Sequence, residues 1–225
     1  GWIAAAGGMA ASKDMDLPIL ILFPEIAFDQ KKFLARVEGM VKKYGYCTVV
    51  VSEGVKGADG KFLSDQGLRD AFGHAQLGGV APVIASIVKE NLGLKYHWGV
   101  ADYLQRAARH IASKSDVAQA YATGKAAVEL ALQGRNSVMP AIRRVSDKPY
   151  KWKIEVAELK NVANKEKFMP RDFITRDGFG ITEKCRTYLA PLIQGEDYPP
   201  YRNGLPQYVR LKNVGVKKKL GAFKI

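Results

Sequence analysis

The sequence predicts an α/β fold with a central, mostly parallel sheet. Two short apolar runs, Leu17–Phe23 and Cys47–Val51, are typical of strands that are buried on both faces. Between them, apolar residues recur at helical spacing. A strand, a helix and a second strand in this order form a right-handed crossover, which makes the two strands parallel.

The first elements are a helix and a strand that leads to an acidic residue. Residues 1–11 are small and apolar, which indicates a buried helix. Pro18 lies near the start of the first strand, where a missing N–H group is tolerated. Glu25 follows the end of that strand, and in open α/β sheets ligands bind at the carboxyl ends of the strands.

The crossover helix has signals at both ends. Asp29 can cap its amino terminus, and Gly45 can end it. After the second strand, residues 52–60 and 73–79 are rich in glycine and predict loops. The second loop lacks the Lys-Ser/Thr pair of a P-loop, so we interpret it as a structural turn, with a ligand role as the weaker alternative.

The remaining elements are predicted from periodicity and from their boundary residues. They are a helix over Val80–Leu92 stopped by Gly93, a strand over Lys95–Ala101, a helix over 117–133 capped by Ser115 or Asp116, strands over Val138–Val145 and Tyr150–Val156, and a helix over Thr182–Ala190. Prolines around and after the last helix indicate an extended tail.

Composition excludes several classes of protein. The net charge of +13 attracts anions, but the one run of basic residues, Lys217–Lys219, is short and has no interleaved aromatics. We therefore expect no nucleic-acid partner. No apolar run approaches the roughly 20 residues that span a bilayer, so no membrane partner is expected either. The two cysteines, Cys47 and Cys185, form neither a disulfide framework nor a metal motif, which favours a reducing, cytoplasmic location.

The segment 102–116 carries the clearest chemical signal. It contains Arg106, Arg109 and Lys114, and Tyr103 lies three residues before Arg106. A planar guanidinium beside a phenol suits a phosphorylated ligand, because the paired N–H donors of arginine match phosphate oxygens. The alternative interpretation is a solvated basic turn.

This segment resembles the substrate turn of the phosphofructokinase family, in which a His- or Tyr-x-x-Arg motif binds the phosphate of fructose 6-phosphate. Gly1-Trp-Ile-Ala-Ala-Ala6 is similar to the start of the helix after that family's Met-Gly-Arg loop. Phe23-Pro-Glu-Ile-Ala-Phe28 is similar to the strand end whose Glu holds the sugar. The three segments agree in order and spacing, and they resemble the pyrophosphate-dependent branch most closely.

The resemblance implies a phosphofructokinase-like layered α/β/α domain that binds a sugar phosphate. We expect it to cover residues 1–145, with the start of its fold upstream, while residues 146–225 form an arm and an extended tail packed on it. The implied reaction is phosphoryl transfer from pyrophosphate to the 1-hydroxyl of fructose 6-phosphate, a step of glycolysis, with Mg²⁺, in a homodimer or homotetramer. An ATP-dependent phosphofructokinase and a non-catalytic sugar-phosphate-binding regulatory domain remain alternatives.

The resemblance also assigns roles to single residues. Tyr103 and Arg106 are expected to bind the 6-phosphate, and Glu25 to accept hydrogen bonds from the sugar hydroxyls. Arg109 and Lys114 are second candidates for the phosphate. His97 stands where the family often has an arginine that reaches the phosphate in a neighbouring subunit. The family's donor loop and its Thr-x-Asp-x-Asp segment are expected upstream, so we expect no catalytic or metal-binding residue within these 225 residues.

Overall fold

The computed structural model describes the chain except residues 12–14, 70–74, 78, 218, 220 and 222–225. Strands β1 (Ile19–Leu22) and β2 (Thr48–Val51) are parallel neighbours, and helix α2 (Gln30–Tyr44) connects them. The predicted strand–helix–strand unit is therefore confirmed. Its boundary signals are confirmed as well, because Asp29 accepts the N–H of Lys32 at 3.1 Å and Gly45 has a φ of 80°.

Helices cover both faces of the parallel pair. Successive side chains of a strand point to opposite faces. Leu20 and Leu22 pack in a cluster with residues of α2 and of α3 (Val80–Leu92), whereas Ile21 and Phe23 pack with residues of α1 (Trp2–Gly7) and α6 (Glu183–Leu189). The layered α/β/α arrangement is confirmed, and α6 forms part of the layer that covers one face of the sheet.

An antiparallel hairpin that the sequence analysis did not predict overlaps the second expected loop. Strands β3 (Asp65–Arg69) and β4 (Ala75–Leu77) pair with each other, so the prediction of a loop over 73–79 is wrong for Ala75–Leu77. Gly73, His74 and Gly78 lie outside the described residues. At Gly79 the φ of 88° supports the interpretation of this end of the segment as a turn before α3.

The strand predicted over Lys95–Ala101 is wrong. This segment has no regular structure, and Trp98 and Val100 are each more than half exposed. A strand depends on hydrogen bonds to a neighbouring strand, and within the part of the chain that the structure describes no strand pairs with these residues.

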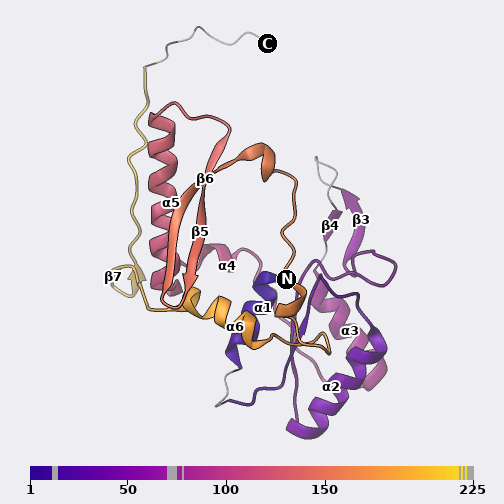
Figure 1. The fold of residues 1–225 in the computed structure, drawn as a ribbon. Helices are drawn as coiled ribbons and strands as arrows, with labels where there is room; N and C mark the ends of the chain where they lie inside the picture. The colour runs from indigo at the N-terminus through magenta and orange to yellow at the C-terminus, as the bar shows by residue number, and fades with distance from the viewer. Residues whose placement is uncertain (12–14, 70–74, 78, 218, 220, 222–225) are drawn as a thin grey trace.

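A long helix and a hairpin form the second part of the molecule. Helix α5 (Lys114–Leu132) packs against β5 (Val138–Asp147) and β6 (Tyr150–Glu158), which pair in antiparallel fashion as one unit (Figure 1). Both strands were predicted. The expected domain boundary at residue 145 falls inside β5, within this paired unit. The division into two domains stays a prediction.

The amino terminus of α5 differs from the prediction. The helix begins at Lys114 and its cap is Ser113, whose hydroxyl accepts the N–H of Asp116 at 3.1 Å; neither Ser115 nor Asp116 is the cap. Ser113 also donates a hydrogen bond to the carbonyl oxygen of Leu192 at 2.6 Å. A partner 79 residues away cannot be read from local sequence.

Replacing Ser113 by alanine is expected to destabilise the protein by about 1–2 kcal/mol, because the helix cap and the bond to Leu192 are both lost. Urea unfolding of the variant and the parent measures the difference. Ser115→Ala is the matched control, since Ser115 lies two residues on and does not cap the helix. A larger loss in Ser115→Ala than in Ser113→Ala would contradict the assignment of the cap.

The other elements are short. They are the helix α4 (Leu104–Ala107), the 3₁₀ helices η1 (Gly8–Ala10), η2 (Arg109–Ile111), η3 (Leu159–Asn161), η4 (Arg171–Phe173) and η5 (Ala190–Ile193), and the strands β7 (Tyr201–Arg202) and β8 (Leu205–Pro206). From 207 to 217 the tail is exposed and irregular. Among the described residues, the helices are too short or too polar to cross a bilayer.

Candidate functional site

Two acidic residues follow the carboxyl ends of the parallel strands. Glu25 comes after β1 and Glu53 after β2, and the register pairs Leu22 with Val51. The two strands therefore end at the same edge of the sheet, where ligands bind in α/β folds. The sequence interpretation singled out Glu25 and missed Glu53, although the same rule applies to both.

The side chain of Glu25 is held by the protein itself. It is 10% exposed, and its Oε1 accepts the backbone N–H of Met169 at 3.0 Å. A Cβ atom added to Gly1 would come within 2.2 Å of both carboxylate oxygens, so the carboxylate lies directly against the backbone there. Oε2 is buried, and it has no hydrogen-bond partner among the described residues. These contacts are typical of a carboxylate that ties a distant segment to the sheet.

Glu53 has the opposite surroundings. It lies in a turn after β2 and is exposed to solvent. Glu53 is therefore accessible to a soluble ligand, whereas the carboxylate of Glu25 is largely covered. The role of Glu25 as a sugar ligand stays a prediction that the structure does not test.

The structure brings Tyr103 and Arg106 together. Helix α4 is one short turn, and the N–H of Arg106 donates to the carbonyl oxygen of Tyr103 at 2.9 Å. The guanidinium carbon lies 5.4 Å from the centre of the Tyr103 ring. Both side chains are exposed, Tyr103 by 68%. The Tyr103–Arg106 pair therefore presents a phenol and a guanidinium side by side to solvent.

The secondary candidates lie in different surroundings. Arg109 donates to the carbonyl oxygen of Asp197 and, at 2.7 Å, to its Oδ1, so its guanidinium is engaged by the carboxyl-terminal segment. Lys114 is exposed in the first turn of α5, and His97 is exposed in the irregular segment before α4. Within the described residues, no hydrogen bond or ion pair links Glu25 to the Tyr103–Arg106 pair.

Residues 192–197, which we call the strap, contact the end of the turn at residues 102–113, which resembles a substrate turn. The N–H groups of Lys114 and Ser115 donate to the carbonyl oxygens of Gly195 and Gln194, at 2.9 and 3.3 Å. Ser113 forms a β-bridge with Glu196. The sequence analysis predicted a wrapping tail but not these contacts, because nothing in the local pattern indicates a partner so far along the chain.

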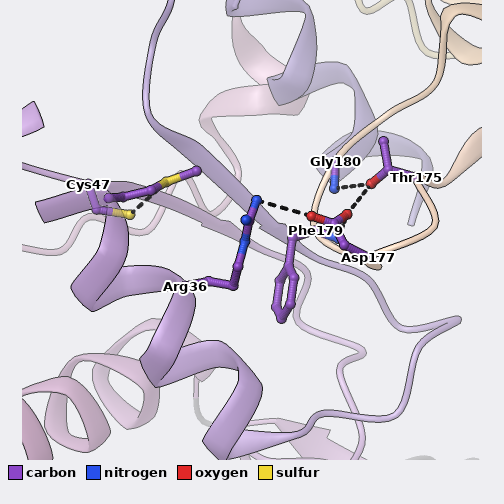
Figure 2. A network of polar contacts seen from close by, with 7 residues as sticks. Arg36, Cys47, Thr175, Asp177, Phe179 and Gly180 are labelled. Carbon is purple, nitrogen blue, oxygen red and sulfur yellow. Dashed lines mark hydrogen bonds and ion pairs between the residues drawn. The ribbon is translucent and has the colours of Figure 1, made fainter. Parts of the chain in front are cut away.

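A second group of polar residues lies beside a cavity at the carboxyl end of β1. The cavity has a volume of about 200 Å³ and is lined in part by Lys32, Arg171 and Arg176. Asp177, also on its wall, pairs with Arg36 of α2 at 3.0 Å and accepts the hydroxyl of Thr175 at 2.6 Å (Figure 2). Burial raises the pKa of Asp177, but the bonds from Thr175, from the N–H of Phe179 and from Arg36 outweigh it, and the net pKa is lowered. The network fastens loop 175–180 to α2.

The described residues contain neither a metal site nor an activated thiol. They include no group of three or more His, Cys, Asp or Glu side chains that could hold a metal ion. Burial raises the pKa of Cys47 to about 11, and burial likewise raises the pKa of Cys185. Both cysteines are therefore thiols at neutral pH, and neither is suited to act as a nucleophile.

The helix-covered parallel pair, together with a Tyr-x-x-Arg turn that faces solvent, defines an α/β protein of the phosphofructokinase type, and the chain belongs to the phosphofructokinase family. Over 99% of its length it is 65% identical to pyrophosphate–fructose 6-phosphate 1-phosphotransferase from Methylococcus capsulatus, covering 53% of that protein. The corresponding protein from Halomonas elongata is 64% identical over 100% of this chain and 54% of its own.

A solved structure agrees with these relatives. Pyrophosphate-dependent phosphofructokinase from Nitrosospira multiformis superimposes with a TM-score of 0.84 at 67% identity, covering 100% of this chain and 52% of that one. No family model matches the chain. The chain spans about half the length of the curated relatives it matches.

Proposed function

We propose that the protein transfers a phosphoryl group from pyrophosphate to the 1-hydroxyl of fructose 6-phosphate, giving fructose 1,6-bisphosphate and phosphate. The observation that carries this proposal is 64–65% identity, over essentially the whole chain, to relatives named for that reaction. The exposed Tyr103–Arg106 pair supports it, since it supplies donors that fit a sugar phosphate. Neither the ATP-dependent nor the non-catalytic alternative is favoured by the relatives.

The role of this part of the protein is to hold and orient the sugar. Phosphoryl transfer depends mainly on positioning and on electrostatic stabilisation of the transferred group. Arg106 donates charge-assisted hydrogen bonds to the 6-phosphate, and Tyr103 adds a hydroxyl beside it. Lys114, which is exposed on α5, adds positive charge to the same segment of the chain. Holding the phosphate end aligns the 1-hydroxyl with its donor.

The proposal includes Mg²⁺, which would neutralise charge on pyrophosphate when bound. The described residues contain no group of three or more His, Cys, Asp or Glu side chains that could hold it, and we expect its protein ligands in the upstream part of the fold. We further propose a cytoplasmic homodimer or homotetramer, in which His97 is accessible to a neighbouring subunit.

The test of the function is a coupled assay of the full polypeptide. Fructose 6-phosphate, pyrophosphate and Mg²⁺ are supplied, and aldolase with an NADH-linked step reports fructose 1,6-bisphosphate. NADH oxidation that requires pyrophosphate is expected, and chelation of the metal should stop it. Turnover with ATP but none with pyrophosphate would overturn the assignment of the donor. Light scattering of the same sample measures the oligomeric state.

Replacing Glu53 by glutamine is expected to raise the KM for fructose 6-phosphate roughly tenfold, because an amide accepts sugar hydroxyls less well than a carboxylate does. The thermal melting temperature should not change, since Glu53 is exposed. Glu25→Gln is the matched comparison. It should lower the melting temperature, because it alters a buried acceptor that holds the N–H of Met169.

The two variants distinguish the sequence prediction from the structural one. If Glu25→Gln raises the KM for fructose 6-phosphate and Glu53→Gln does not, Glu25 is the sugar ligand after all. Melting curves with and without fructose 6-phosphate provide a second measurement, since the ligand stabilises only a protein that still binds it.

A further inference from the structure

We propose that Arg144 is a positioning residue that sets the orientation of the Tyr103–Arg106 pair relative to the parallel sheet. The inference rests on the proposed function, because it concerns how the sugar-phosphate site is held in place. Arg144 lies on β5, far along the chain from that pair, and it belongs to no group discussed so far.

The guanidinium of Arg144 is clamped between two aromatic rings. Its central carbon lies 3.9 Å from the ring centre of Tyr188 and 4.7 Å from that of Tyr150. One terminal nitrogen lies 2.6 Å from Oδ1 of Asp147, and the other donates to the carbonyl oxygen of Tyr188 at 2.6 Å. The side chain is 18% exposed. These contacts combine ring stacking with hydrogen bonds from the edge of the guanidinium, which a lysine ammonium cannot do.

The clamp joins two parts of the molecule. On one side, the hydroxyl of Tyr150 accepts a hydrogen bond from Nε2 of Gln119 at 2.5 Å, and Gln119 is buried on α5. On the other side, the ring of Tyr188 on α6 packs against Trp2, with ring centres 5.4 Å apart. A continuous line of contacts therefore runs from α5, through the β5–β6 hairpin and Arg144, to α6 and α1 on the sheet.

Both supports of the substrate turn depend on this joint. Helix α5 begins immediately after the turn, so its orientation sets the direction of the turn. The strap follows α6, begins within η5, and reaches back to Arg109 through Asp197. If α6 shifts relative to the hairpin, both supports move with respect to the sheet. Arg144 contacts α6 and the hairpin directly, so its side chain holds these two elements together.

The neighbouring residue provides a matched control. Arg143 on the same strand is 64% exposed and pairs with Glu155 at 3.1 Å, away from the rings. Removing either side chain deletes one positive charge from adjacent positions. Only the loss of Arg144 opens the joint between the hairpin and α6.

The experiment compares Arg144→Met and Arg143→Met in the full polypeptide. Arg144→Met is expected to raise the KM for fructose 6-phosphate roughly threefold to thirtyfold, the range typical of coupling through packed networks. The KM for pyrophosphate and the kcat at saturating fructose 6-phosphate should stay close to those of the parent. Arg143→Met should change neither KM. Equal effects of Arg144→Met on both substrates, or no effect on either, would overturn the proposal.

A second measurement does not require activity. Hydrogen exchange of the backbone N–H groups of 104–113 is expected to accelerate in Arg144→Met and to stay unchanged in Arg143→Met. Tyr188→Phe should behave as the parent, because it keeps the ring and the carbonyl oxygen, whereas Tyr188→Leu should resemble Arg144→Met. If Arg144→Met does not fold, the two Tyr188 variants decide the question. If the parent protein shows no turnover, the proposed function fails, and the exchange rates still decide whether the joint orders the turn.

Discussion

Replacing Arg106 by alanine is expected to raise the KM for fructose 6-phosphate roughly tenfold to hundredfold, because a charge-assisted contact to phosphate contributes about 1.5–3 kcal/mol. The KM for pyrophosphate should not change, since the pair with Tyr103 is assigned to the sugar phosphate alone. Arg106 is exposed at the end of a one-turn helix, so its truncation leaves no cavity and should not lower the melting temperature.

Steady-state kinetics with each substrate varied in turn measure the two effects separately. Arg135→Ala is the control, because Arg135 is an exposed arginine beyond the far end of α5 and its removal changes the net charge by the same amount. Two outcomes would contradict the assignment: an equal increase in both KM values, or an Arg135→Ala variant that raises the KM for fructose 6-phosphate as much as Arg106→Ala does. Either would mean that Arg106 acts only through the net charge of the protein and does not contact the 6-phosphate.

Replacing Phe33 by alanine is expected to destabilise the protein by about 3–5 kcal/mol, the usual cost of deleting a buried phenyl ring. Phe33 is 0% exposed, and its ring centre lies 5.5 Å from that of Phe28. It belongs to the cluster that joins β1 to α2 and α3, so the cavity would open in the layer that holds the sheet.

Urea unfolding gives the change in the free energy of unfolding. Lys31→Ala, on the exposed side of the same helix, is the control and should change the stability by less than about 0.5 kcal/mol. A loss below about 1 kcal/mol in Phe33→Ala would show that the layer between β1 and α2 is not a cooperative core.

The proposed site separates into a part that the sequence predicted and a part that it did not. Tyr103 and Arg106 are three residues apart, so one helical turn is enough to bring them together, and the structure does so. Arg109 was a candidate for the phosphate, but it is engaged by Asp197, 88 positions away. No local pattern distinguishes a free arginine from one that a distant carboxylate holds.

The same distinction explains Glu25 and Glu53. The sequence places each acid after an apolar strand, and a parallel pair brings both to one edge of the sheet. Which of them is accessible depends on Met169, whose N–H reaches Glu25 across 144 positions. Burial by a remote segment is a property of the assembled fold, so sequence analysis had no basis for predicting that Glu25 is covered and Glu53 exposed.

The sequence alone specified the features of this protein that depend on local interactions, namely the helix ends and the buried faces of the helices. The helix caps are local: Asp29 accepts an N–H three residues ahead, and the N–H groups of Gly45 and Gly93 donate to carbonyl oxygens four residues back. The spacing of apolar residues selects the face that each helix buries. The tertiary structure decided the features that need a distant partner. Lys95–Ala101 is apolar enough for a strand but lacks a neighbouring strand among the described residues, and the clamp at Arg144 exists only because β5, β6 and α6 meet. Backbone and guanidinium donors bond to the acceptors that the fold brings within hydrogen-bond distance. Those acceptors can be far away in the sequence, so the local sequence does not identify them.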